Sequence, residues 1–258
     1  MQIVAIVITT ALASLVFSMV GGGGTQILVP LFFWIGLKFD HGAIPLALLV
    51  ASINCFSAGA IYIRRKVMLS YKVVVPLAAT VLVGAPLGAI TAHFISSRVG
   101  SGTSVLMIAF ALSNMAVGGG VLRSGKKDEK EMVNAVRLYA VGVTICFGVG
   151  FFIGLVGRDG APFVLALLIF LGLDAKKSAG AAAVIIAAGC LAAFITHLSK
   201  ATLTWEQVIA AAVPALIASQ MGARFMTDRM GARTIQILFA LLMFVVGAVI
   251  LIQAVAAI

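Results

Sequence analysis

Long runs of apolar residues, separated by short polar segments, make up most of this 258-residue chain. An α-helix needs roughly 20 residues to cross the ~30 Å hydrocarbon core of a bilayer, and eight of the runs approach that length. The predicted spanning helices are residues 2–20, 44–63, 73–95, 103–122, 135–156, 179–198, 207–226 and 234–256. Because a backbone in lipid must satisfy its own hydrogen bonds, the pattern predicts an all-α polytopic membrane protein.

Two further apolar runs, residues 27–37 and 161–173, are too short to cross. At a rise of 1.5 Å per residue they would reach only about 16 and about 20 Å. Each follows a long run across a break that contains glycine, at residues 21–24 and 157–160. We expect helices that begin near the middle of the membrane. The pattern leaves open whether they cross fully or re-enter.

The two breaks belong to an internal repeat. An offset of 136 residues carries Gly21 onto Gly157 and Gly24 onto Gly160, and weaker identities follow in the same order. Each repeat then contains about five segments, four long and one short. The predicted division is a first repeat at residues 1–122, a linker at 123–134 and a second repeat at 135–258.

Composition agrees with a bilayer as the main solvent. Hydrophobic residues make up 62% of the chain and charged residues 10%, whereas about 25% is usual in soluble proteins. The net charge of +10 could indicate nucleic-acid binding. However, the Lys and Arg residues form short clusters between apolar runs, which is typical of loops at cytoplasmic lipid headgroups. We therefore predict the lipid bilayer as a partner and no nucleic acid.

The placement of the basic residues chooses between a parallel and an inverted repeat. The parallel arrangement divides the 18 basic residues 10 to 8, and the inverted one puts 14 of them on the cytoplasmic side. Those 14 are Arg64, Arg65, Lys66, Lys72, Arg123, Lys126, Lys127, Lys130, Arg137, Lys176, Lys177, Arg224, Arg229 and Arg233. We predict the inverted repeat in a cell membrane, with a bacterial inner membrane as the expected location and both termini outside.

Inverted repeats with paired broken helices place a binding site near the midplane. The short helices leave N–H groups unpaired at their first turns, where the helix dipole contributes about half a positive charge. Glycines there allow the backbone to approach a ligand closely. These features favour a small anion. The candidate substrate-binding residues are Gly21, Gly22, Gly23, Gly24, Thr25, Gln26, Asn54, Gly157, Arg158, Gly160 and Ala161.

The charged residues of the second break have alternative roles. Arg158 is the Arg predicted deep in the membrane, and its planar fork of donors suits carboxylate or sulfonate oxygens. It could instead form a structural pair with Asp159, or extend to the surface. Asp159 is the acidic residue near mid-depth and a candidate for proton coupling. For Thr25, Gln26 and Asn54, hydrogen bonding between helices is the alternative to substrate contact.

The apolar runs contain no HExxH, no GxSxG and no paired carboxylates, so we do not expect an enzyme. Cys55, Cys146 and Cys190 lie inside apolar runs without CxxC spacing, as small packing residues do. No metal and no cofactor is predicted. A nucleotide-binding motif is also absent, so transport would be coupled to protons, to another ion or to the substrate gradient itself.

The run GGGGTQILVP at residues 21–30 resembles the glycine-rich signature of the sulfite exporter TauE/SafE family, also called the toluene sulfonate uptake permease family. The Ala-rich stretch 43–52 and GAPLGA at 84–89 look similar too. The second half departs, because GRDGAP at 157–162 stands where many relatives have another run of glycines. The resemblance implies transport of small sulfur-containing anions such as sulfite, sulfoacetate or other organosulfonates, often outward.

Together these observations predict a secondary transporter of a small sulfur-containing anion that works by alternating access. The alternatives are a small-anion channel and a transporter of a non-sulfur carboxylate. The oligomeric state is left open.

Overall fold

The computed structural model describes residues 1–19, 21–67, 69–98, 112, 135–171, 173–229 and 231, with parts of 234–252. Over these residues the chain is helical and contains no strand, which confirms the predicted fold class. The elements are α1 (Gln2–Met19), α2 (Thr25–Trp34), the π-helical turn η1 (Phe39–Ala43), α3 (Ile44–Arg64), α4 (Tyr71–Arg98), α6 (Ala135–Val156), α7 (Ala161–Phe170), α8 (Ala175–Leu198) and α9 (Trp205–Arg229).

Six helices in the described part of the chain are long and apolar enough to span a membrane: α1, α3, α4, α6, α8 and α9. Large apolar side chains also lie exposed on the outside of the bundle, for example Leu12, Phe94, Ile195 and Ile217. A lipid environment covers such side chains without cost, whereas water would not. The chain is therefore a multi-pass membrane protein. The predicted helix 103–122, apart from 112, and much of 234–256 lie outside the described residues.

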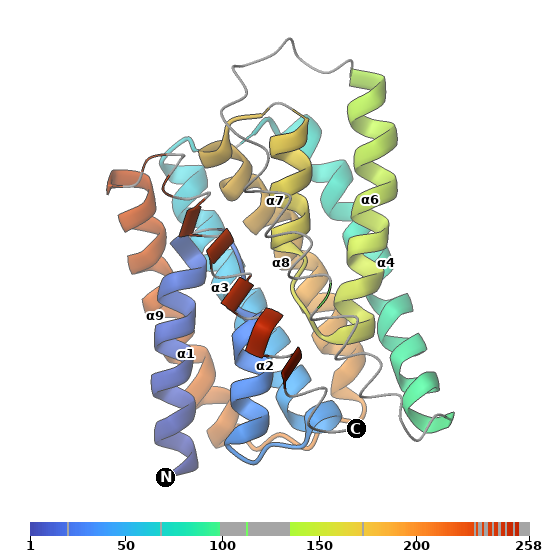
Figure 1. Ribbon diagram of the computed structural model, residues 1–258, viewed down its shortest axis with the longest axis vertical. Coiled ribbons are helices and arrows are strands. Elements are labelled where there is room, and N and C mark those ends of the chain that lie inside the picture. The colour runs from blue at the N-terminus through green and yellow to red at the C-terminus, as the bar shows by residue number, and fades with distance from the viewer. Residues whose placement is uncertain are drawn as a thin grey trace.

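Each short helix turns back beside the helix before it. In Figure 1, α1 rises from the N-terminus and α2 returns toward the same end. The amide of Gln2, at the start of α1, donates to the Ile35 carbonyl oxygen just after α2, at 3.3 Å. Figure 1 shows α6 and α7 folded back in the same way. Both short helices have ten residues and begin inside the bundle, which favours re-entry over a full crossing; re-entry itself stays a prediction.

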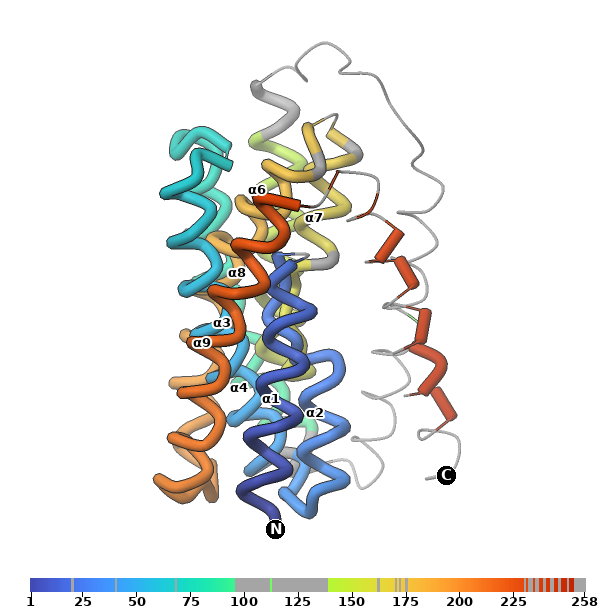
Figure 2. Tube along the Cα trace, turned by 90° about the vertical axis from the view of Figure 1, so that its left-hand side faces the viewer, coloured from blue at the N-terminus to red at the C-terminus, as the bar shows by residue number. Residues whose placement is uncertain are grey.

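The helices α3 and α8 pack together at the centre and run in opposite directions. Around them, α1 packs against α9, and α4 packs against α6, so the first helix of each half contacts the last described helix of the other half. Figure 2 shows α1 and α9 side by side. An inverted repeat predicts these directions and exchanged contacts. The repeat relation and its boundaries stay predictions.

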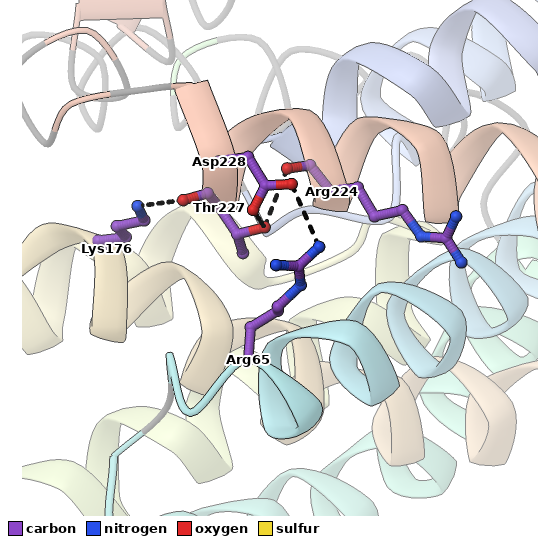
Figure 3. A network of polar contacts seen from close by, with 5 residues as sticks. All are labelled: Arg65, Lys176, Arg224, Thr227 and Asp228. Carbon is purple, nitrogen blue, oxygen red and sulfur yellow. Dashed lines mark hydrogen bonds and ion pairs between the residues drawn. The ribbon is translucent and has the colours of Figure 1, made fainter.

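Basic residues gather at one end of the bundle (Figure 3). Arg65, after α3, forms an ion pair with Asp228 of α9 at 3.2 Å. Lys176 of α8 donates to the Thr227 carbonyl oxygen at 2.5 Å. The Arg65 and Asp228 side chains are about half exposed, so the pair contributes little stability, about 0–1 kcal/mol. These contacts bring together basic residues that the inverted arrangement assigns to one side. That this side is cytoplasmic stays a prediction.

Small residues let α4 and α6 approach closely. Gly84 and Gly88 on α4 face Gly150 and Gly154 on α6, each pair with a four-residue spacing. A Cβ on Gly154 would overlap the Ala85 carbonyl oxygen and would lie 2.9 Å from the carbonyl carbon. In lipid, where apolar burial does not drive helix association, such backbone contact supplies much of the packing energy.

This interface generates a stability prediction. Gly154→Ala places a methyl group against α4 backbone that cannot move aside, so we expect a loss of about 1–3 kcal/mol. Gly148→Ala is the matched control on the same helix, because a Cβ there meets nothing within 4 Å. Thermal melting of the detergent-solubilised protein should show a lower midpoint for Gly154→Ala only. Equal midpoints for the two variants would contradict close α4–α6 packing.

Candidate functional site

The two breaks meet in the interior of the bundle. All six residues from Gly21 to Gln26 are buried, and so are all five from Gly157 to Ala161. Both segments end at the first turn of a short helix, α2 or α7. The structure therefore brings the predicted site residues of both halves into one region, closed to the outside in this conformation.

One carboxylate joins the two helix N-termini. Oδ2 of Asp159 accepts hydrogen bonds from the Thr25 backbone N–H and from the Thr25 hydroxyl, both at 3.2 Å. Oδ1 accepts from the Ala161 backbone N–H, also at 3.2 Å. Thr25 and Ala161 are the first residues of α2 and α7, and neither helix has a side-chain cap from its own N-cap residue. Asp159 therefore caps both helices with one negative charge, an interaction favoured by both helix dipoles.

Further hydrogen bonds hold the breaks together. The Asp159 backbone N–H donates to Oγ1 of Thr25 at 2.5 Å, so these two residues bond each other in both directions. The side-chain amide of Gln26 donates to the Asp159 carbonyl oxygen at 3.3 Å. These contacts link residues 134 and 133 positions apart in the chain. The site thus belongs to neither half alone.

Arg158 is fully buried beside this carboxylate. Its guanidinium carbon lies 4.8 Å from the centre of the Phe163 ring, which is the geometry of a cation–π contact. Because the side chain is buried within the bundle, the suggestion that it extends to the surface is wrong. Both carboxylate oxygens of Asp159 accept hydrogen bonds from Thr25 and Ala161. The roles of Arg158 in binding substrate or in pairing with Asp159 stay predictions.

Asn54 of α3 positions the first break. Its Nδ2 donates to the carbonyl oxygens of Gly22 at 2.8 Å and of Gly23 at 3.3 Å. Two carbonyl acceptors fix which end of the amide is the nitrogen. Tyr62, also on α3, donates its hydroxyl to the Ser18 carbonyl oxygen at the end of α1. Sequence reasoning missed Tyr62, since an aromatic residue near a helix end is usually an interfacial one.

Several of the glycines are required by helix packing. A Cβ on Gly23 would overlap the Ala51 side chain and lie 2.9 Å from the Ala51 Cα, and a Cβ on Gly21 would strike the backbone of Ala179. Gly24 and Gly157 adopt left-handed φ values of 88° and 71°, which side chains disfavour. The sequence pattern predicted that these glycines let the backbone approach a ligand closely. Their neighbours show that they also let α3 and α8 contact the breaks.

Gly22 differs from its neighbours in the run. A Cβ there would lie 3.2 Å from the Phe17 ring and 3.9 Å from the Ala161 Cβ, so it would project between the two breaks with almost enough room. Its φ is not left-handed, so alanine is tolerated by the backbone. Gly22 is therefore the position in this run where a side chain would probe the site with little damage to the fold.

Comparisons with known proteins identify one family and one membrane transporter relative. The model of the family described as "Sulfite exporter TauE/SafE" matches residues 6–250. A relative from Bacillus subtilis, "Probable membrane transporter protein YunE", is 23% identical over 269 aligned residues. The match covers 96% of this chain and 96% of the relative. No solved structure matches.

The contrast between neighbouring glycines is testable. Gly23→Ala should lower the melting midpoint, with a loss of about 1–3 kcal/mol, because Ala51 and its helix backbone must shift. Gly22→Ala should stay within about 1 kcal/mol of the parent protein, because only the Phe17 ring needs to adjust. Melting curves of the two purified variants measure this. A Gly22→Ala variant as unstable as Gly23→Ala would contradict the described packing.

Proposed function

Because the chain belongs to the sulfite exporter TauE/SafE family, we propose that it is a secondary transporter of a small sulfur-containing anion. Sulfite, sulfoacetate or another organosulfonate would bind between the two breaks and cross by alternating access. The word exporter in the family's description supports an outward direction as part of this proposal. The family membership supports membrane transport. The substrate, the binding site and the mechanism are what we propose.

One observation carries the site assignment: the first N–H groups of two helices converge on one anionic group. Thr25 and Ala161 donate their backbone N–H groups to the same carboxylate at 3.2 Å, and the Thr25 hydroxyl adds a third donor. A sulfite ion or a sulfonate group presents three oxygens in a compact pyramid, so three convergent donors suit it. Backbone donors at helix N-termini are also a common binding arrangement for oxyanions.

The charges of the site favour a small anion. The two helix N-termini together contribute about one positive charge, and Arg158 contributes a full one. Against these stands the single negative charge of Asp159. The imbalance of about one positive charge, in a buried and weakly screened region, attracts a monovalent anion. Arg158 offers a planar fork of donors that can contact two oxygens at once.

Alternating access needs a site shared by two halves that can tilt against each other. The donors come from both halves: Thr25 begins α2, and Ala161 begins α7. A tilt that separates α2 from α7 on one side would expose the donors to water there. The remaining contacts would keep the other side closed. Coupling to a proton or another ion would set the direction of net transport.

The proposal predicts specific anion binding that depends on Arg158. Sulfite, thiosulfate, sulfoacetate and taurine should be titrated into the purified protein, and at least one sulfur anion should bind. Arg158→Lys keeps the charge but loses the bidentate fork, which should cost about 1.5–3 kcal/mol, or more than tenfold in affinity. Arg158→Ala should abolish binding. Arg65→Lys at the end of α3 is the control and should bind as the parent protein does.

Flux measurements separate the proposal from a channel. Proteoliposomes loaded with unlabelled substrate should take up labelled substrate faster than empty ones, since a carrier exchanges substrate across the membrane. Uptake that does not saturate and shows no such stimulation would indicate a channel. Binding of a carboxylate such as acetate in preference to every sulfur anion would contradict the substrate class.

A further inference from the structure

The anion site between the two breaks is already occupied by the chain's own carboxylate. Asp159 is fully buried and takes the Thr25 N–H, the Thr25 hydroxyl and the Ala161 N–H. These are the donors that a transported anion would use. Two negative groups cannot share them, because like charges in a buried site repel strongly. Substrate binding at this site therefore requires that the Asp159 carboxylate leaves.

Two buried amide oxygens in the same region lack hydrogen-bond donors. Among the described residues, Oε1 of Gln26 and Oδ1 of Asn54 have no hydrogen-bond partner, and both side chains are fully buried. Their amide nitrogens donate to the Asp159 and Gly22 carbonyl oxygens, so both amide groups lie at the breaks. Buried acceptors without donors are unfavourable. A protonated carboxyl group or a protonated oxyanion carries the O–H that such acceptors need.

We propose that Asp159 is the resident anion of the transport site and that substrate displaces it as a neutral acid. The carboxylate holds the N-termini of α2 and α7 together while no substrate is bound. When the site opens, Asp159 takes one proton from the water on the open side, and the substrate anion takes over the helix donors. One proton then accompanies one anion. This inference rests on the proposed function, and it makes Asp159 the residue that couples protons to transport.

The ionisable groups whose charge interacts with Asp159 among the described residues are an arginine and two thiols, which keep their charge state in the relevant range. They are Arg158 in the same break, Cys55 on α3 and Cys190 on α8. Between about pH 4.5 and about pH 7.5 an Arg stays cationic and a thiol stays neutral. His197, another ionisable side chain on α8, contacts the Gly154 carbonyl oxygen on α6 at 2.9 Å. A variant that keeps His197 but lacks the Asp159 charge separates the two.

The decisive experiment measures binding of methanesulfonate and of sulfite to the purified full-length protein and to Asp159→Asn. Methanesulfonate stays ionised throughout the range, so its own titration does not interfere. Asn keeps the shape of the side chain and removes the competing charge. Asp159→Asn should therefore bind about tenfold more tightly at about pH 7.5, as expected for loss of a charge that two helix dipoles stabilise. Wild-type affinity for methanesulfonate should rise as the pH falls from about 7.5 to about 4.5, and the Asp159→Asn affinity should not.

Asp174→Asn is the matched control. Asp174 caps the N-terminus of α8 through the Lys177 N–H at 2.9 Å and lies exposed beyond the far end of α7. The same substitution at this cap should leave anion affinity and its pH dependence as in the wild type. Asp159→Glu keeps the charge and should show no gain in affinity.

The outcomes separate the two proposals. Wild-type binding with equal or weaker binding by Asp159→Asn would overturn the resident-anion proposal and leave the proposed function standing. A pH dependence that persists in Asp159→Asn would assign the proton to another group, such as His197, and would also overturn it. If Asp159→Asn does not fold, the wild-type protein alone still tests the proposal. A wild-type affinity for methanesulfonate that does not change with pH would overturn the resident-anion proposal. Absence of binding of either anion to any of the proteins at any pH would overturn the proposed function itself.

Discussion

The arrangement of this protein depends on one carboxylate shared by two helix N-termini. Asp159 satisfies the first N–H groups of α2 and α7, which would otherwise be buried without acceptors in the middle of a membrane protein. An unsatisfied backbone group in such surroundings costs several kcal/mol. The contact also connects the two halves, since Thr25 and Asp159 are 134 residues apart. The short helices and the buried glycines of both breaks lie at this meeting point.

Close packing of small residues positions the first break next to the two central helices. Gly21 lies against Ala179 of α8, and Gly23 lies against Ala51 of α3, so both central helices touch the first break through backbone or methyl groups. The exchanged contacts of α1 with α9 and of α4 with α6 enclose it. A scaffold of close helix contacts holds a polar centre whose hydrogen bonds cross between the halves. Such a centre can open only if the halves move relative to each other, as alternating access requires.

The sequence predicted the helices well, because a bilayer imposes a length and a polarity on each of them. Residues 135–156 coincide at both ends with α6. The prediction was less accurate where helices continue past the apolar core. The run predicted from residue 179 begins in the structure at Ala175, because Asp174 caps a first turn that contains Lys176 and Lys177. A prediction based on apolar residues stops the helix at such lysines, although the helix continues through them.

The candidate site was harder to predict. Each break and most of its residues could be identified from glycine patterns, but the partner of Asp159 could not. Its neighbour Arg158 offered an obvious pair, whereas the hydrogen bonds from Thr25 reach Asp159 from the other half through tertiary packing. The repeat carries a further signal for this acid: the offset that carries Gly21 onto Gly157 places Asp159 opposite Gly23. The second half thus has a carboxylate at the position where the first half has a glycine without a side chain.

The most direct measurement is an experimental structure of the full-length protein in lipid nanodiscs with saturating sulfite. The account predicts the sulfur oxyanion within about 3 Å of the backbone nitrogens of Thr25 and Ala161. It also predicts the Asp159 carboxyl group turned away from both. A sulfite ion bound elsewhere, with Asp159 still bridging α2 and α7, would contradict the central claim that this carboxylate and the substrate occupy one site in turn.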